Sequence, residues 1–198
     1  IALDGTNPLF HERLGEFYRA LGGTTPHGEK WYNWAVQEYK KAIALNAYNS
    51  VYYYYLGWTY VALDMEEEAV QAFRKAIAFN PRITFYYENL GRYFLSIEQV
   101  EAALKVYQQA VQINPQKMPE ILKVCQEYKF SYEQYQRLVP EEAKSRQIFA
   151  SLLAQQGDWE ASKVEYRKAL ELSGKQPEYY KAMLEACRQR HDYECMRT

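Results

Sequence analysis

The sequence predicts an all-α protein built from repeated helix pairs, and an internal period of 34 residues is the first reason. The segments "YLGWTYVALDMEEEAVQAFRKAIAFNP" and "NLGRYFLSIEQVEAALKVYQQAVQINP" share small, aromatic and proline positions at this spacing. The matched pairs are Leu56 and Leu90, Gly57 and Gly91, Tyr60 and Phe94, Ala69 and Ala103, Phe73 and Tyr107, Ala76 and Ala110, and Pro81 and Pro115. The composition, with 48% hydrophobic and 25% charged residues, is typical of a soluble globular protein.

The small residues of the first segment indicate close contact between helices. Gly57, Ala69 and Ala76 leave room for a neighbouring helix, while Tyr60 and Phe73 fill the space that remains. The proline that closes each segment lacks an amide hydrogen and restricts the residue before it, so it ends the second helix.

This order of Leu-Gly, aromatic, Ala, aromatic, Ala and Pro resembles the tetratricopeptide repeat family. The resemblance implies a right-handed α-solenoid, in which antiparallel helix pairs stack and each pair buries its apolar face against its neighbours.

The run "VYYYYLGWTY", residues 51–60, is ambiguous when it is considered alone. Aromatic and β-branched side chains favour a strand over residues 51–55, because they suit a pleated surface. The repeat instead places the run on a first helix, where consecutive residues meet different neighbours. Tyr53 and Leu56 are then expected in the core, and Tyr54 and Trp58 are expected to face an inner groove.

We expect one domain over residues 1–198, composed of successive units. They are the tail of a preceding helix over 1–7, a unit with an eight-residue insertion over 8–48, regular units over 49–82 and 83–116, a shortened unit over 117–140, a unit over 141–176 and a terminal partial unit over 177–198. The extra residues of the first unit are expected between its helices, in "GGTTPHGEKWYN". The last stretch, "HDYECMRT", is expected to begin a second helix.

Charge and hydropathy argue against a nucleic-acid partner and a membrane-spanning segment. A net charge of −1 and a pI near 6.4 argue against a nucleic-acid partner. The longest stretch without a charged residue, 42–63, carries Asn46, Asn49 and Ser50 in its middle, so we expect no transmembrane segment. The chain opens without methionine or a signal segment, which suggests a piece of something longer.

No catalytic, metal or cofactor site is expected. His11, His27 and His191 lie on different units without paired-ligand spacing. Gly23 and Gly28 have the spacing of a phosphate loop, but a glutamate stands where the phosphate-binding lysine belongs, so a surface loop is favoured.

The cysteines leave two possibilities open. Cys187 and Cys195 are eight residues apart across the last expected turn, so they could form a disulfide in an oxidising compartment. As free thiols they would be small core residues, which is the interpretation we favour.

The inner wall of the solenoid is the candidate binding site. Spacing from the Leu-Gly pairs places twelve side chains on it: Glu12, Glu16, Arg19, Tyr54, Trp58, Val61, Phe85, Glu88, Arg92, Leu122, Lys123 and Gln126. An aromatic patch flanked by mixed charge suits a peptide or a segment of a partner protein, because aromatic and arginine side chains most often dominate binding energy. The alternative is that Tyr54 and Trp58 only cover one another or contact the next unit.

The family's carboxylate clamp can be tested against the same positions. It uses lysine, asparagine and arginine on successive first helices, and Tyr54 and Trp58 occupy the matching places here. We therefore expect another binding mode.

The order of units also resembles the extramembrane tails of bacterial O-antigen ligase or polymerase-like membrane proteins. "NPLFHERLGEFY", "YYYYLGWTYVAL" and "YEQYQRLVP" carry this resemblance. It implies a domain of a bacterial inner-membrane protein, on either side of the membrane, that contacts glycan or organises the assembly; otherwise the chain would be cytoplasmic. Self-association through open solenoid ends is a third possibility.

Overall fold

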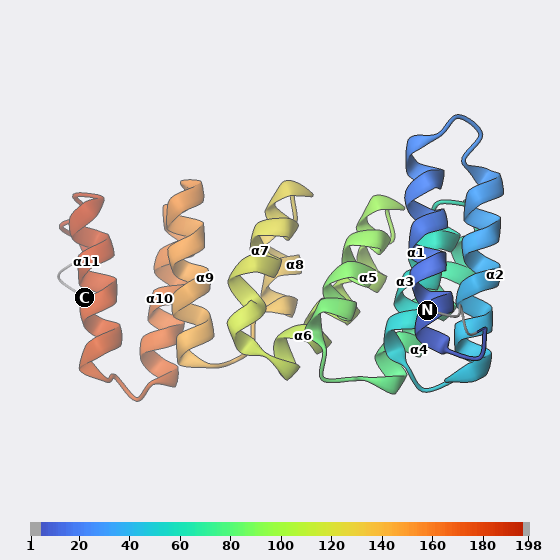
Figure 1. The fold of residues 1–198 in the computed structure, drawn as a ribbon. Coiled ribbons are helices and arrows are strands. Elements are labelled where there is room, and N and C mark those ends of the chain that lie inside the picture. The colour runs from blue at the N-terminus through green and yellow to red at the C-terminus, as the bar shows by residue number, and fades with distance from the viewer. Residues whose placement is uncertain (1–4, 196–198) are drawn as a thin grey trace. The chain divides into compact units, whose positions relative to one another are not determined.

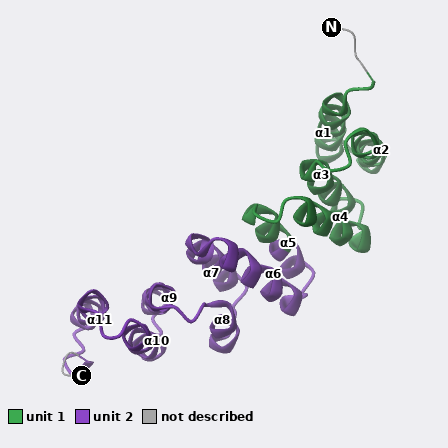
Figure 2. Ribbon diagram, turned by 90° about the horizontal axis from the view of Figure 1, so that it is seen from below, with its two compact units in different colours: residues 1–90 green, residues 91–198 purple. Residues whose placement is uncertain are grey.

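The computed structural model describes residues 5–195, and within them the chain forms helices and turns without a strand (Figure 1). This confirms the predicted all-α class and its helix pairs. Residues 51–55 are helical and lie in α3 (Ser50–Val61). The chain divides into two compact units, residues 1–90 and 91–198, and the division falls within α5 (Thr84–Ser96) (Figure 2).

Unit 1 contains two helix pairs followed by the start of α5. The first pair is α1 (Pro8–Thr24) and α2 (Glu29–Leu45), and the second is α3 and α4 (Glu66–Phe79). Asparagine caps begin both first helices: Asn7 accepts a hydrogen bond from the Leu9 N–H and Asn49 accepts one from the Val51 N–H.

Glycine lets the paired helices of unit 1 approach closely. A Cβ on Gly57 would lie 2.8 Å from the Phe73 ring, and one on Gly15 would lie 2.8 Å from the Tyr39 ring. Tyr53 and Leu56, which are 7% and 6% exposed, belong to the core as predicted. The small-and-large complementarity inferred from the repeat is therefore present.

The insertion lengthens the first helix pair rather than separating its helices. α1 and α2 have 17 residues each, whereas α3 has 12 and α4 has 14. Most of residues 22–33 are therefore helical, which corrects the expectation that they lie between the helices. Gly22 permits this, because the Tyr32 ring lies 2.7 Å from where its Cβ would be. Of the expected helix tail over 1–7, residues 1–4 lie outside the described residues, and 5–7 form a turn.

Unit 2 continues from the end of α5 in helices of uneven length. They are α6 (Val100–Ile113), the 3₁₀ helix η1 (Pro115–Lys117), α7 (Met118–Glu127), α8 (Tyr132–Leu138), α9 (Ala143–Gln156), α10 (Trp159–Leu172) and α11 (Pro177–Gln189). Gly91 contacts the Tyr107 ring, as Gly57 contacts Phe73 in unit 1. The seven residues of α8 end just before Pro140.

A buried ion pair lies at the centre of the α8–α10 region. The side chains of Arg146 and Glu165 are 2% and 0% exposed, and Arg146 Nη1 donates to Glu165 Oε2 at 2.9 Å. Tyr132 and Lys168 donate to the other oxygen of Glu165. Burial raises the pKa of Glu165, but these hydrogen bonds outweigh it and hold the pKa below its ordinary value.

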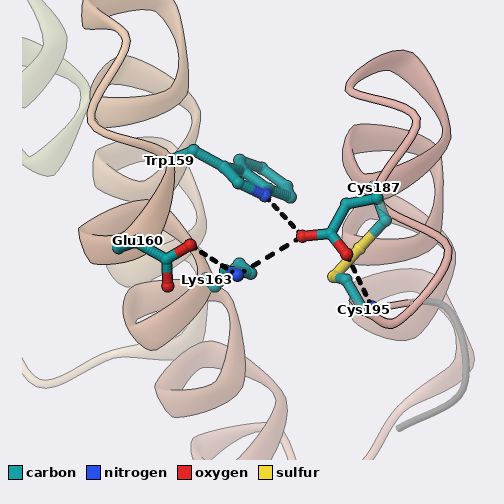
Figure 3. The surroundings of a disulfide bond; sticks show 6 residues. Trp159, Glu160, Lys163, Cys187 and Cys195 are labelled. Atoms are coloured by element: carbon teal, nitrogen blue, oxygen red, sulfur yellow. Dashed lines mark hydrogen bonds and ion pairs between the residues drawn. A yellow bond between two sulfur atoms is a disulfide. The ribbon is translucent and has the colours of Figure 1, made fainter.

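The end of unit 2 is closed by a disulfide between Cys187 and Cys195 (Figure 3). This corrects the interpretation that we favoured from the sequence, which was two free thiols. The residues after α11 also turn back instead of beginning a second helix, because His191 has a φ of 55° and the Asp192 N–H closes the turn on the Cys187 carbonyl. Residues 196–198 lie outside the described residues.

Asp192 fixes this turn against α10. Its carboxylate accepts hydrogen bonds from Trp159 Nε1 at 2.7 Å and from the Cys195 N–H at 2.9 Å, and it pairs with Lys163 Nζ at 3.3 Å (Figure 3). Both cysteines are buried in a small core with Met183. The turn and its disulfide therefore cover apolar surface that a second helix would cover in a complete pair.

Candidate functional site

Part of the predicted site comes together in unit 1, on a surface formed by α1, α3 and the start of α5. We call this surface the unit 1 face. It contains Glu12, Glu16, Arg19, Tyr54, Tyr55, Trp58 and Phe85.

The α1 part of the unit 1 face carries two acids. Glu12 is 9% exposed, and the side chain of Glu16 is 26% exposed. Burial raises the pKa of Glu12, and the negative charge of Glu16 raises it further. Arg13 Nη1 donates to Glu16 Oε2 at 2.9 Å, whereas Glu12 has no hydrogen bond or ion pair among the described residues. The two carboxylates therefore lie next to one another on α1, and Arg13 partly offsets their charge.

Tyr55 links the charged and aromatic parts of the unit 1 face. Its ring stacks on the Tyr39 ring at a centroid distance of 6.0 Å, and the Arg19 guanidinium carbon lies 5.7 Å from its centroid. Burial raises the pKa of Tyr55, and Glu16 raises it further. The α1 side chains therefore lie against an aromatic ring from the next helix pair.

Tyr54 is the centre of the aromatic part. Its ring centroid lies 5.2 Å from that of Phe85, 5.4 Å from that of Tyr86 and 6.1 Å from that of Phe73. Trp58 meets Phe73 edge to face at 5.3 Å. Tyr54 and Trp58 are half-buried, and Phe85 is 51% exposed. Contact with the next helix therefore accounts for part of the Tyr54 surface, as the alternative interpretation allowed, and an aromatic surface still remains open.

Two buried polar atoms next to Tyr55 have no hydrogen-bond partner within residues 5–195. They are Arg19 Nε and Tyr39 Oη, and Tyr39 is fully buried. Burial raises the pKa of Tyr39, and the positive charge of Arg19 opposes that rise, so the two groups are close. Polar atoms buried without partners are uncommon in folded proteins.

The remaining predicted residues lie elsewhere. In unit 1, Val61 is half-buried at the end of α3, and Glu88 is half-buried on α5. In unit 2, Arg92, Lys123 and Gln126 are exposed. Leu122 is wholly buried in the core of unit 2, although a cavity of about 210 Å³ between α7 and α9 borders it. The expectation that Leu122 presents its side chain to a ligand is therefore wrong, because α7 uses its apolar side for packing.

Sequence reasoning missed Tyr55 as a site residue. The four consecutive tyrosines could have indicated it, because consecutive residues of a helix point in different directions and therefore contact different surroundings. It also missed an aromatic cluster at the long α1–α2 pair, where Tyr18, Trp31 and Trp34 contact one another and Lys30 Nζ lies 4.6 Å from the Trp34 ring centroid.

Each unit also contains a cavity outside the unit 1 face. A cavity of about 240 Å³ in unit 1 is lined by Tyr53, Leu56 and Tyr60 among others, and one of about 340 Å³ in unit 2 lies between α9, α10 and α11. Within residues 5–195 no three or more His, Cys, Asp or Glu side chains are grouped to hold a metal ion. None of the helices in that range has the length and apolar character needed to cross a bilayer.

Stacked helix pairs with small residues at their contacts define a helical-repeat protein. Family models described as tetratricopeptide repeat match residues 50–83, 86–117 and 143–176, about half of the chain. The chain belongs to the tetratricopeptide repeat family, whose members generally mediate protein–protein interactions.

Several solved structures resemble this chain. A crystal structure of MamA is 22% identical, covers 87% of this chain and 81% of its own, and has a TM-score of 0.49. YrrB, described as a TPR protein with an unusual peptide-binding site, is 18% identical and has a TM-score of 0.45. The match covers 98% of this chain and 82% of the YrrB chain. The Arabidopsis OM64 TPR domain is 24% identical and has a TM-score of 0.43, and the match covers 60% of this chain and 95% of that domain. A search of the curated proteins gives no significant match, and none of these comparisons supports the narrower resemblance to O-antigen ligase tails.

Proposed function

We propose that this chain is a non-catalytic interaction module that binds a peptide, or a segment of a partner protein, on the unit 1 face. The observation that carries the proposal is the open aromatic surface around Tyr54, where Phe85 is 51% exposed beside a half-buried Trp58. Aromatic side chains bury large areas with few rotatable bonds, so they often dominate binding energy.

The core of unit 1 uses only part of this surface. Tyr54 packs against a buried cluster that contains Tyr53 and Tyr86, whereas Phe85 remains 51% exposed. The charged residues that border the aromatic rings resemble the polar rim of a protein interface. Family membership points the same way, since members generally bind other proteins.

Calorimetric titration of the whole chain with a peptide library tests the proposal. We expect saturable binding by a subset of peptides, and we expect Trp58→Ala to weaken it about 30-fold or more. Trp34→Ala is the matched control, because Trp34 is 40% exposed but lies on α2 among other aromatic residues. Circular dichroism would confirm that both variants fold. Peptide binding that survives both Trp58→Ala and Phe85→Ala would place the ligand elsewhere and refute the proposal.

A glycan is the second candidate ligand, because exposed aromatic rings also stack on sugar rings. In that case the chain would serve as an accessory domain of a bacterial surface-glycan ligase or polymerase. Oligosaccharides titrated under the same conditions distinguish the two: saturable glycan binding lost in Trp58→Ala, without peptide binding, would favour the glycan. If neither ligand binds, sedimentation at two protein concentrations would test self-association.

A further inference from the structure

Glu12 is the charged residue of the unit 1 face that the fold explains least. It is 9% exposed, and its carboxylate has no hydrogen bond or ion pair among the described residues. Partial burial disfavours the charged form of this carboxylate, and the negative charge of Glu16 adds to the effect, while Arg13 opposes it. A positive group supplied by a ligand would stabilise the charged form.

Glu16 can accept a further donor. It pairs with Arg13, whose side chain is 69% exposed, and such exposed pairs are weak. The Tyr55 hydroxyl also lies next to its carboxylate. A carboxylate has about four lone-pair sites. The pair with Arg13 therefore leaves room for a second cation between Glu16 and Glu12.

An aromatic ring borders the two acids on the α3 side. Both carboxylates act on the Tyr55 hydroxyl electrostatically, and the Arg19 guanidinium already lies against the Tyr55 ring. Carboxylates together with the face of a tyrosine ring attract ammonium and guanidinium groups. This combination favours an organic cation.

A metal ion fits the same place less well. Calcium takes six to eight oxygen ligands, and magnesium needs near-ideal octahedral geometry. Over residues 5–195 no three or more His, Cys, Asp or Glu side chains are grouped to hold a metal.

The uncompensated buried atoms beside Tyr55 supply a second, independent sign of a ligand. Tyr39 is fully buried, and neither its hydroxyl nor Arg19 Nε has a hydrogen-bond partner in the described part of the chain. The Arg19 guanidinium lies beside the Tyr39 hydroxyl and against the Tyr55 ring, and its five N–H donors leave some available for a carbonyl oxygen of a bound main chain.

We propose that the unit 1 face selects peptides in which a lysine or arginine stands next to a large apolar residue. The cation lies between Glu12 and Glu16 beside the Tyr55 ring, and the apolar side chain packs on Tyr54, Trp58 and Phe85. This proposal rests on the proposed function and adds the charge of the ligand. An acidic peptide is disfavoured by the same two carboxylates.

The test is a set of fluorescein-labelled peptides that are identical except at one position beside a phenylalanine. That position is Lys, Arg, Gln or Glu, and binding to the whole chain is followed by fluorescence anisotropy. We expect the Lys and Arg peptides to bind about tenfold more tightly than the Gln peptide, and the Glu peptide to bind most weakly. Raising the salt concentration should reduce these differences.

Variants identify the carboxylates responsible. In Glu12→Gln/Glu16→Gln the preference for Lys over Gln should disappear while the Gln peptide still binds, and Glu16→Lys should shift the preference toward the Glu peptide. The matched control is Glu127→Gln/Glu171→Gln, which changes the net charge equally at two exposed sites of unit 2 and should keep the preference. Thermal unfolding would verify that each variant is folded.

The possible failures are distinguishable. If the four peptides bind equally and Trp58→Ala abolishes binding, the charge selection is refuted and the proposed function stands. If no peptide binds, or if Trp58→Ala changes nothing, the proposed function itself fails. A Lys preference that persists in Glu12→Gln/Glu16→Gln would also overturn the assignment to these two residues.

Discussion

Gly57 shows how a single missing side chain sets the distance between two helices. A Cβ at this position would lie 2.8 Å from the Phe73 ring, and Phe73 is fully buried, so neither group can move away easily. Alanine would therefore force the α3–α4 pair apart, although alanine is the better helix former.

We expect Gly57→Ala to destabilise the protein by about 1–3 kcal/mol, as overpacked core substitutions do. Gly23→Ala is the control, because the nearest atom to its added Cβ is Tyr32 Oη at 3.6 Å, an ordinary contact. That variant should raise stability by about 0.5 kcal/mol through helix propensity alone. Urea unfolding followed by circular dichroism measures both. An unchanged midpoint in Gly57→Ala would show that the ring can shift.

At the residue scale, periodic spacing predicts core residues better than surface contacts. Tyr53 and Leu56 are buried as the repeat predicts, because their burial depends on their own helix pair. The role of Tyr55 depends on Arg19 and Tyr39 from a different pair, and spacing within one repeat carries no information about them. Leu122 was misplaced because the period of the repeat is lost after Pro115, where η1 precedes the short α7.

At the scale of elements, the buried ion pair of unit 2 fixes three helices together. Arg146 on α9 bonds Glu165 on α10 and also the Val139 carbonyl at the end of α8. Removing Arg146 would leave the buried Glu165 carboxylate with only Tyr132 and the partly exposed Lys168 as partners. We therefore expect Arg146→Met to destabilise the protein by about 3–5 kcal/mol.

The double variant Arg146→Met/Glu165→Leu should recover much of that loss, since no unpaired charge remains. Arg137→Met is the comparison, because it breaks the exposed pair between α8 and α6, Arg137 with Glu101, and should have a much smaller effect. Thermal unfolding of the three variants gives the ranking. A double variant less stable than Arg146→Met would show that the pair itself is net stabilising.

Helix ends illustrate what sequence patterns cannot reveal. The turn after each of five first helices contains a residue with a positive φ, a conformation that usually calls for glycine. In these turns only Gly157 is a glycine, and the other residues are Asp64, Glu98, Lys129 and His191. In each case an N–H after the turn bonds a carbonyl of the preceding helix, such as Gln99 to Phe94. The insertion was misjudged for a similar reason, since Gly22 and Gly23 suggested a loop but lie within α1.

At the scale of the whole molecule, the carboxylates with lowered pKa values predict acid sensitivity. Burial opposes ionisation of Glu38 and Glu165, but hydrogen bonds outweigh it and hold the pKa of each below its ordinary value. The Cys195 N–H and Trp159 lower the pKa of Asp192 to about 2. Because the unfolded chain binds protons at higher pH than these groups do, acidification favours unfolding.

We expect the unfolding temperature to fall progressively as the pH decreases from about 5 toward 2, because the stability from these groups is complete only above their unfolded pKa values. Glu12 acts in the opposite direction, since its raised pKa makes protonation favour the fold. Melting curves at constant ionic strength measure the effect, and Glu165→Gln should make the pH dependence shallower. A melting temperature that stays constant from pH 5 to pH 3 would contradict this account.

The disulfide that closes unit 2 has a practical consequence for the choice of expression host. In a reducing cytosol Cys187 and Cys195 would be recovered as thiols, so the turn held by Asp192 would lose its covalent link. Scrambled pairing is not the concern, because burial raises the pKa of the third cysteine, Cys125, to about 12 and leaves almost no reactive thiolate. Material exported to an oxidising compartment is therefore the appropriate starting point for every measurement described above.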